Sequence, residues 1–466
     1  MQLTTELLLL SATLSVLATE ADAIEANVSE AITINPNREA RHSGGRHCPI
    51  LPSLASADAS SPPTQHKILS SDGASEDFFG FSVAISGDTA IAGAFRADDE
   101  IKGLDAGAAY IFSRTGNVWQ PRAKLTALDG RANDTLGGNV AIWGDTAVVG
   151  AIGHDGNGNN AGAAYVFERS GDAWQQQAKL MASDGDADDA FGQNVAIFGD
   201  RIVIGAPHDD DKGDGSGSVY VFTRNGENWE QQAKLTARDG LTGDLFGISV
   251  ALTHDTILVG ADLHDERATN AGAAYVFVQS GNKWVQQAKL TAADGAETDI
   301  FGVRVALSGD TALISARRDD DKVMGVDAGS AYVFTRRGTT WHQQAKLVAP
   351  DGDVDDRFGR DVALNKDTAL IGAMHQDDRG DNSGAAYVFK RAGTSWTLLT
   401  KLTAHDGASG DLLGWSVAMS HNNALIAAVR NDDHGNESGA AYIFDFDDQN
   451  LPTIPCNIEK GMTPND

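Results

Sequence analysis

The stretch Phe246-Gly247-Ile248-Ser249-Val250-Ala251 decides the fold, because its pattern returns seven times along the chain. Each copy has Phe or Leu, then Gly, two variable residues and Val-Ala, and successive copies lie 55 or 57 residues apart. The glycines of the seven copies are Gly80, Gly137, Gly192, Gly247, Gly302, Gly359 and Gly414. Self-similarity at a period of this order is typical of arrays of supersecondary units. One such unit cannot bury its apolar face alone, so the pattern predicts units packed on one another.

Each of the first six repeats contains four short β-rich runs of the length of β-strands. In the fourth repeat they cover residues 247–252, 256–261, 272–277 and 284–290, and turns rich in Gly, Asp and Asn separate them. Such runs predict a four-stranded antiparallel sheet. No part of the array has a helical period of useful length, so the predicted fold class is all-β.

Aromatic residues recur at fixed positions in the third and fourth runs. The tyrosines of the third run are Tyr110, Tyr165, Tyr220, Tyr275, Tyr332, Tyr387 and Tyr442. Each precedes a Phe by two residues, so both side chains point to one side of the strand. Six tryptophans open the fourth run, namely Trp119, Trp174, Trp229, Trp284, Trp341 and Trp396. Because they recur from repeat to repeat, we expect both sets to pack between neighbouring sheets.

The last repeat lacks a fourth strand, which the beginning of the array can supply. The seventh repeat ends at Phe444, whereas His66-Lys67-Ile68-Leu69 precedes the first Gly motif and is followed by Ser71-Asp72-Gly73. Lys-Leu is followed by Asp-Gly in the same way in other repeats. A borrowed strand would join the ends of the array and remove an exposed sheet edge. We therefore predict, over residues 65–446, a seven-bladed β-propeller of four-stranded antiparallel blades that an N-terminal strand closes.

The motifs resemble the FG-GAP repeats of the integrin α-subunit head and of its bacterial relatives. The resemblance rests on Phe79-Gly80, Phe191-Gly192, Phe246-Gly247, Phe301-Gly302 and Phe358-Gly359, and on Gly93-Ala94, Gly150-Ala151, Gly205-Ala206-Pro207 and Gly260-Ala261. It covers residues 66–444 and implies a seven-bladed β-propeller. Integrin-type repeats hold calcium in an Asp-x-Asp-x-Asp-Gly loop between their first two strands. Here that connection is a tight turn such as Gly87-Asp88, too small to supply six to eight oxygens, so the family's calcium site does not carry over.

Composition limits the classes of partner. The chain of 466 residues has 36 Lys and Arg against 65 Asp and Glu, a net charge of -29. This charge repels nucleic acids and anionic membranes, so we expect no nucleic-acid partner. The apolar stretch Leu7–Ala18 has the length of a signal-peptide core and is too short to span a bilayer.

Four segments follow from these patterns. Residues 1–23 are interpreted as a signal peptide without a basic start, 24–64 as a flexible lead, 65–446 as the propeller and 447–466 as a polar tail. The predicted location is extracellular or at the cell surface. Cys48 and Cys456 flank the propeller, and they form either a disulfide between the two tails or two unpaired thiols.

Acidic residues accumulate between the second and third strands and in the links between blades. One interpretation is that Asp and Asn side chains cap nearby main-chain N–H groups. The other is that selected loops bind a divalent cation, with calcium as the candidate cofactor. The candidate metal ligands are Asp155, Asn157 and Asn159 in one loop and Asp209, Asp211 and Asp214 in the next.

The two variable residues after each motif Gly are predicted to ring the mouth of the central channel. The candidate ligand-binding residues among them are Arg304, Arg360, Asp361 and Trp415. Simple drift of a structural ring explains the variation equally well.

The pattern favours a binding or adhesion scaffold that recognises a protein or glycan through one loop-rich face. No nucleophile elbow, zinc-binding helix or phosphate loop is present, so no enzyme activity is predicted. The alternatives are an extracellular polymer hydrolase with carboxylates at the channel mouth, and a purely structural surface-layer element. The sequence does not predict the oligomeric state.

Overall fold

The computed structural model describes residues 63–446. The predicted signal peptide (1–23), nearly all of the predicted lead (24–64), the tail (447–466) and both cysteines lie outside this range. Within it the regular elements are 28 β-strands. The described range contains no helix that is long and apolar enough to cross a membrane.

The strands group into seven blades. Blades 1 to 4 consist of β2 (Val83–Ser86), β3 (Thr89–Ala94), β4 (Ala108–Thr115) and β5 (Val118–Leu125); β6 (Val140–Trp143), β7 (Thr146–Ala151), β8 (Ala163–Ser170) and β9 (Ala173–Leu180); β10 (Asn194–Phe198), β11 (Arg201–Ala206), β12 (Ser218–Asn225) and β13 (Asn228–Leu235); β14 (Ser249–Leu252), β15 (Thr256–Ala261), β16 (Ala273–Ser280) and β17 (Lys283–Leu290). Blades 5 to 7 consist of β18 (Val305–Ser308), β19 (Thr311–Ala316), β20 (Ser330–Arg337) and β21 (Thr340–Leu347); β22 (Phe358–Asn365), β23 (Thr368–Ala373), β24 (Ala385–Ala392) and β25 (Ser395–Leu402); β26 (Leu413–Ser420), β27 (Asn423–Ala428), β28 (Ala440–Asp445) and β1 (Thr64–Ile68).

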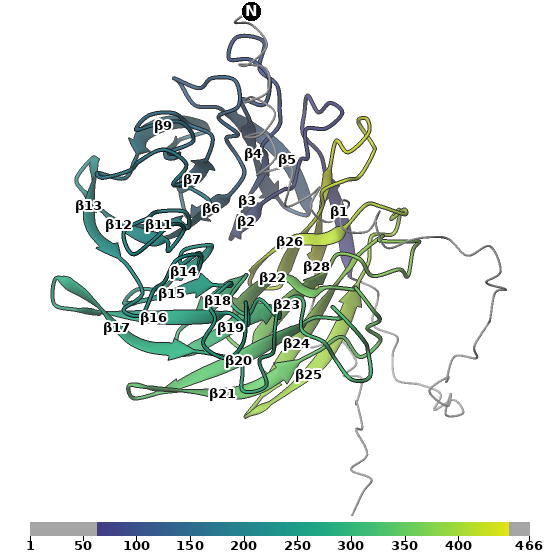
Figure 1. Ribbon diagram of the computed structural model, residues 1–466. Helices are drawn as coiled ribbons and strands as arrows, with labels where there is room; N and C mark the ends of the chain where they lie inside the picture. Colours follow the sequence, from purple (N-terminus) through teal and green to yellow (C-terminus); the bar gives the residue numbers. More distant parts are fainter. Residues whose placement is uncertain (1–62, 447–466) are drawn as a thin grey trace, which may run out of the picture. The chain divides into compact units, whose positions relative to one another are not determined.

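The blades form a closed ring, as predicted. Blade 7 has the strand order β1-β28-β27-β26, and β1 pairs antiparallel with β28 from Thr64 opposite Asp445 to Ile68 opposite Ala441. Figure 1 shows β1, in purple, at the edge of the yellow-green closing blade. The first strands of neighbouring blades contact one another all the way round, including β2 against β26. Both the seven-bladed fold and its closure by an N-terminal strand are confirmed.

The core lies between the blades and is built from the repeated aromatic residues. Phe246 lies edge-on to Tyr275, with ring centroids 5.5 Å apart, and to Phe277 at 5.9 Å. These rings pack against Val203 and Val221 of the preceding blade. Burying one such side chain stabilises the fold by about 2–3 kcal/mol. The predicted packing of the Tyr-x-Phe pairs between sheets is therefore confirmed.

Glycine is needed where the inner strands of neighbouring blades approach closely. A Cβ on Gly260 would lie 1.9 Å from the carbonyl oxygen of Gly302 in the next blade. The motif glycine Gly302 itself has a φ of 99°, a left-handed conformation that side chains rarely adopt. The repeated Phe-Gly and Gly-Ala motifs thus follow from the close approach of backbones around the ring axis.

The ring has two faces, which we name by their connections. The loop face carries the loops between second and third strands and the links between blades, and the turn face carries the tight turns between first and second strands. On the loop face each loop bonds to the following link, for example through the carbonyl of Thr269 and the N–H of Thr298, 2.9 Å apart. The acidic residues of the loops between second and third strands and of the links therefore gather on the loop face.

Candidate functional site

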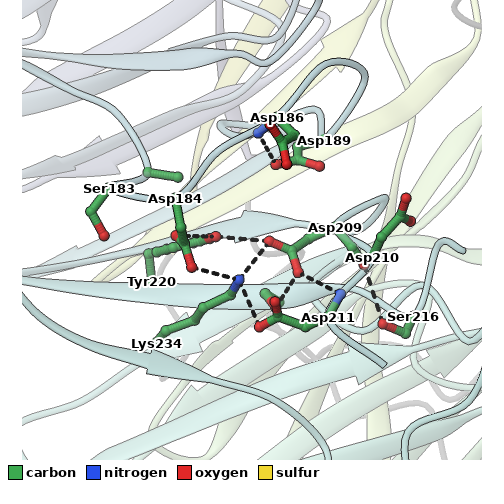
Figure 2. Close-up of polar contacts among 12 residues, drawn as sticks. Ser183, Asp184, Asp186, Asp189, Asp209, Asp210, Asp211, Ser216, Tyr220 and Lys234 are labelled. Carbon is green, nitrogen blue, oxygen red and sulfur yellow. Dashed lines mark hydrogen bonds and ion pairs between the residues drawn. The ribbon is translucent and has the colours of Figure 1, made fainter. Parts of the chain in front are cut away.

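Blade 3 shows how the loop face holds its carboxylates (Figure 2). The ammonium nitrogen of Lys234, on β13, lies 3.0 Å from Asp184 Oδ2. It also lies 2.8 Å from Asp209 Oδ2 and 2.7 Å from Asp211 Oδ2. The hydroxyl of Tyr220 lies 3.0 Å from Asp184 Oδ1 and 2.8 Å from Asp209 Oδ2. One ammonium group thus occupies the point where three carboxylates converge.

In every blade a lysine of the fourth strand contacts an aspartate of the preceding link, and we call this group the lysine cluster. The number of carboxylates around the lysine differs between blades, from one at Lys124 to three at Lys234. Each lysine lies 2.7–3.0 Å from an aspartate of the preceding link, in the pairs Lys67–Asp406, Lys124–Asp72, Lys179–Asp129, Lys234–Asp184, Lys289–Asp239, Lys346–Asp294 and Lys401–Asp351. Each also lies over the Tyr ring of its own blade. Burial alone would raise the pKa of Asp184, but hydrogen bonds from Lys234 and Tyr220 outweigh it and lower that pKa. The fourth strand of each blade contains this lysine, and that recurrence in the sequence could have predicted the lysine clusters.

Two further sets of seven aspartates accept main-chain N–H groups. In the links, the carboxylate accepts the main-chain N–H of the residue three positions earlier. These residues are Asp77, Asp134, Asp189, Asp244, Asp299, Asp356 and Asp411. In the loops, the carboxylate accepts the main-chain N–H of the residue five or seven positions later. These residues are Asp98, Asp155, Asp210, Asp265, Asp320, Asp377 and Asp432. Burial raises the pKa of Asp189, Asp299 and Asp356 to about 6. The capping interpretation of the acidic loops therefore holds for these residues.

The first group of predicted metal ligands lies in the loop between β7 and β8. Asp155 Oδ1 accepts a main-chain N–H at 3.0 Å, and Asn157 Nδ2 donates to the carbonyl of Ala182 at 2.7 Å. The carbonyl of Asn159 accepts a main-chain N–H of the following link at 2.8 Å. These bonds tie the loop to itself and to the following link, and calcium binding by these three residues stays a prediction.

The second group lies in the loop between β11 and β12. Asp209 and Asp211 both contact Lys234, and Asp209 is buried. The carbonyl of Asp214 accepts the N–H of Gly243 at 2.9 Å. The structure therefore brings two of the three predicted ligands together, around an ammonium group.

Blade 4 carries the donor set that best suits a metal ion. One ligand atom each of Asp239, His264 and Glu266 lies within 4.8 Å of the others. Lys289 lies 2.8 Å from Asp239 Oδ2 and also contacts Glu266 and the Nε2 of His264. The Nδ1 of His264 lies 3.0 Å from the buried carboxylate of Asp244. This group is the lysine cluster of blade 4 with an added imidazole, a type of donor that sequence reasoning did not include.

The four predicted channel residues form two adjacent pairs. The guanidinium of Arg360 lies over the Trp415 ring, 3.9 Å from its centroid, and Arg304 Nε lies 4.0 Å from Asp361 Oδ1. Arg360 is only 5% exposed and Trp415 only 8%. The structure thus brings all four together over blades 5 to 7, but it places the Arg360–Trp415 pair inside the protein.

The second variable residue of each motif joins neighbouring blades. Its side-chain oxygen accepts the N–H of the motif Val in the next blade, in the pairs Ser82–Val140, Asn139–Val195, Asn194–Val250, Ser249–Val305, Asp361–Val417 and Ser416–Val83. At the junction of blades 5 and 6 this position holds Arg304, and Asp361 instead accepts the N–H of its own neighbour Val362 at 2.9 Å. The recurrence of Ser, Asn or Asp at this position was the sequence evidence for the hydrogen bonds.

Comparison with known families agrees with the geometry. The model of the FG-GAP repeat family matches residues 63–112, 119–167, 174–222, 229–277, 284–334, 341–389 and 396–444. These ranges cover well over half of the chain, which therefore belongs to the FG-GAP repeat family. A search of the curated proteins found no match.

Proposed function

We propose that the protein is an extracellular or cell-surface binding and adhesion scaffold whose loop face recognises a protein partner. The observation that carries this proposal is the pair of loops in which repeats differ in length. The β3–β4 and β19–β20 loops each have two residues more than the other loops between second and third strands. In repeat proteins, insertions of this kind map to one face, often the binding face.

The two longer loops present aliphatic side chains to solvent. Ile101 is 94% exposed and Leu104 68% in the first, and Val323 is 85% exposed and Val326 60% in the second. The corresponding loops of the other blades are polar, for example Asp155-Gly-Asn-Gly-Asn-Asn160. Exposed aliphatic groups surrounded by charge are typical of protein interaction sites.

Both loops are held rigid by the same bonds. The main chains of Asp99 and Gly103 exchange two hydrogen bonds of 3.1 and 2.9 Å, and those of Asp321 and Gly325 exchange two of 3.0 and 2.8 Å. Hydrogen bonds from the N–H of Ile101 and of Lys102 lower the pKa of Asp99, so this carboxylate stays charged. The expected partner therefore offers apolar pockets beside basic side chains.

A divalent cation at the loop face is part of the proposal. The acidic loops, and the Asp239, His264 and Glu266 group with its imidazole, support it, whereas the seven lysines act against it by charge competition. Calorimetry tests it with calcium, which prefers the oxygen ligands of the acidic loops, and with zinc, which also accepts the imidazole of His264. A cation that binds only the folded chain raises the unfolding midpoint.

The hydrolase alternative gains no support from the described residues. The carboxyl groups whose pKa is raised to about 6 are the link residues Asp189, Asp299 and Asp356, each capped by a main-chain N–H. They belong to three different links rather than to one pair at the channel mouth.

Retention of cell-surface proteins on the immobilised chain tests the proposed function. The chain is exposed to the surface-protein fraction of the organism that produces it. The wild type should retain a protein that the loop-face variant Ile101→Ser/Val323→Ser does not retain. Val118→Ser, a matched change of an exposed aliphatic residue beside the β4–β5 turn, should retain it. Equal retention by all three chains would refute the loop face as the binding surface.

A further inference from the structure

The turn face carries two aromatic residues at a position that is otherwise polar. This position is the second residue after the motif Val-Ala, as in Val140-Ala141-Ile142-Trp143. Its seven occupants are Ser86, Trp143, Phe198, Thr253, Ser308, Asn365 and Ser420. The two aromatic residues are in neighbouring blades 2 and 3, at the ends of β6 and β10. Since this is the innermost strand of each blade, they lie beside the opening of the central channel on the turn face.

Three of the five polar occupants, all of them serines, join neighbouring blades, and the aromatic residues do so differently. Ser86 and Ser420 accept the N–H groups of Gly144 and Gly87 at 3.2 and 3.0 Å. Trp143 and Phe198 have no oxygen to accept such a bond, and their rings contact each other with centroids 4.3 Å apart at 41°. Trp143 nevertheless remains 45% exposed. A contact that only held blades together would not require an indole half in water.

A carboxylate without a partner lies in the tight turn that follows Phe198. In four blades the Asp of the turn accepts a hydrogen bond from an Arg Nε of the third strand, in the pairs Arg114–Asp88, Arg169–Asp145, Arg336–Asp310 and Arg391–Asp367. In blade 3 the corresponding Arg224 instead contacts Glu168 at 2.5 Å and the carbonyl of Gly226 at 3.1 Å. Among the described residues the side chain of Asp200 has neither a hydrogen bond nor an ion pair. It is exposed and lies two residues from Phe198.

We propose that Trp143, Phe198 and Asp200 form a carbohydrate site on the turn face. The C–H face of a β-linked pyranose is apolar and stacks on aromatic rings, while its equatorial hydroxyls donate hydrogen bonds to a carboxylate. The net charge of -29 disfavours acidic polysaccharides, so the ligand is a neutral glycan. This inference goes beyond the proposed function, because it concerns the opposite face and a different class of ligand.

Titration calorimetry with cellohexaose and chitohexaose, two neutral β-1,4-linked probes, tests the site. Trp143→Ser and Phe198→Thr replace each ring by a residue that other blades carry at this position, so both variants should fold. Each should weaken binding of the better probe about ten-fold, the loss of one stacking contact. Asp200→Asn should weaken it less, and Ile101→Ser on the loop face should leave it unchanged.

Thermal unfolding of the same variants separates a binding role from a structural one. The proposal requires binding to fall while the unfolding midpoint stays within about two degrees of the wild type. It is overturned if the wild type binds neither sugar, or if Trp143→Ser and Phe198→Thr bind as tightly as the wild type. Retained loop-face binding in these variants would show that the two sites are independent.

Discussion

Blade 3 and blade 7 have the same sheet but are made from the chain in different ways. Blade 3 is one continuous segment, β10 to β13, whose last two strands meet in a hairpin at Asn225 and Asn228. Blade 7 takes β26 to β28 from the C-terminal end of the array and β1 from its N-terminal end. Its outer strand therefore has no hairpin to hold it, and side-chain contacts must set its register.

The contacts of β1 reproduce those of β13. Lys67 lies 3.0 Å from Asp406 as Lys234 lies 3.0 Å from Asp184. Gln65 and Gln231 each accept a main-chain N–H of the preceding link through Oε1. The β12–β13 ladder has a bulge at Val221–Phe222, whereas the β1–β28 ladder runs without one. The repeated side chains, rather than the hairpin, thus define the position of a fourth strand.

Removal of β1 should have the largest effect and would break this comparison most severely. A chain that starts at Ser70 loses the buried Ile68 and leaves the edge of β28 unpaired. We expect its unfolding midpoint to fall by more than ten degrees or its single transition to broaden, as thermal unfolding followed by circular dichroism would show. A chain that starts at Pro63 keeps β1 and serves as the control. Equal midpoints would mean that β1 does not close the ring.

Loss of a cluster lysine should have the next largest effect. Lys234→Met leaves three converging carboxylates, one of them the buried Asp209, and should lower the free energy of unfolding by about 2–4 kcal/mol. Lys67→Met leaves only the partly exposed Asp406 and Asp433 and should cost about 1 kcal/mol. Urea unfolding measures both values. A larger loss for Lys67→Met would contradict this ranking.

The hydrogen bonds around the ring axis allow the closing junction to be compared with an internal one. Ser416 accepts the N–H of Val83 across the junction of blades 7 and 1, and Ser82 accepts that of Val140 across the junction of blades 1 and 2, both at 3.1 Å. Each Ser→Ala change leaves a buried N–H without its partner and should cost about 1–2 kcal/mol in urea unfolding. A negligible loss at Ser416 alone would mean that the closing junction is looser.

The pH dependence should give the smallest effect. Burial raises the pKa of Asp189, in the link before blade 3, to about 6, whereas the unfolded carboxyl titrates near 3.8. The folded chain therefore binds a proton more readily, so this residue destabilises the fold above pH 6 and the penalty disappears as the pH falls toward 4. The unfolding midpoint of the wild type should therefore rise as the pH falls from 6 to 4. In Asp189→Asn this rise should be smaller by about one or two degrees.

Asp411, the corresponding residue before blade 7, provides the comparison for this measurement. Its pKa is also raised by burial, and its carboxylate accepts hydrogen bonds from Ala408 and Asn431. Asp411→Asn should therefore flatten the curve less than Asp189→Asn. Below pH 4 both variants should lose stability like the wild type, because Lys-paired carboxylates with a lowered pKa, such as Asp184, become protonated. A midpoint that falls steadily from pH 6 downward would contradict the assignment.

The fold could be predicted from the sequence because its determinants are local and repeated. Glycine, tyrosine and lysine positions return in every unit, and the missing fourth strand after Phe444 has its match around Ile68. The candidate sites depend on single departures from the repeat, whose partners are set by tertiary contacts. Arg360 and Trp415 were predicted to line the channel mouth, yet both are buried, and Trp415 packs against Arg360 and Phe81. To predict the contact between Trp143 and Phe198, one would need to know how two neighbouring blades are aligned side by side. Sequence spacing alone does not give this alignment.

A disulfide between the two ends of the array tests the closed ring most directly. Thr64 and Asp445 are paired residues of adjacent antiparallel strands, a separation that a disulfide spans. In a chain with Cys48→Ser and Cys456→Ser, the pair Thr64→Cys/Asp445→Cys should form an intramolecular bond in mild oxidant, seen on non-reducing gels and by peptide mass mapping. The pair Thr64→Cys/Asp255→Cys, which joins blade 7 to blade 4, should form none. Failure of the first pair, or bonds only between molecules, would contradict a ring closed by its own N-terminal strand.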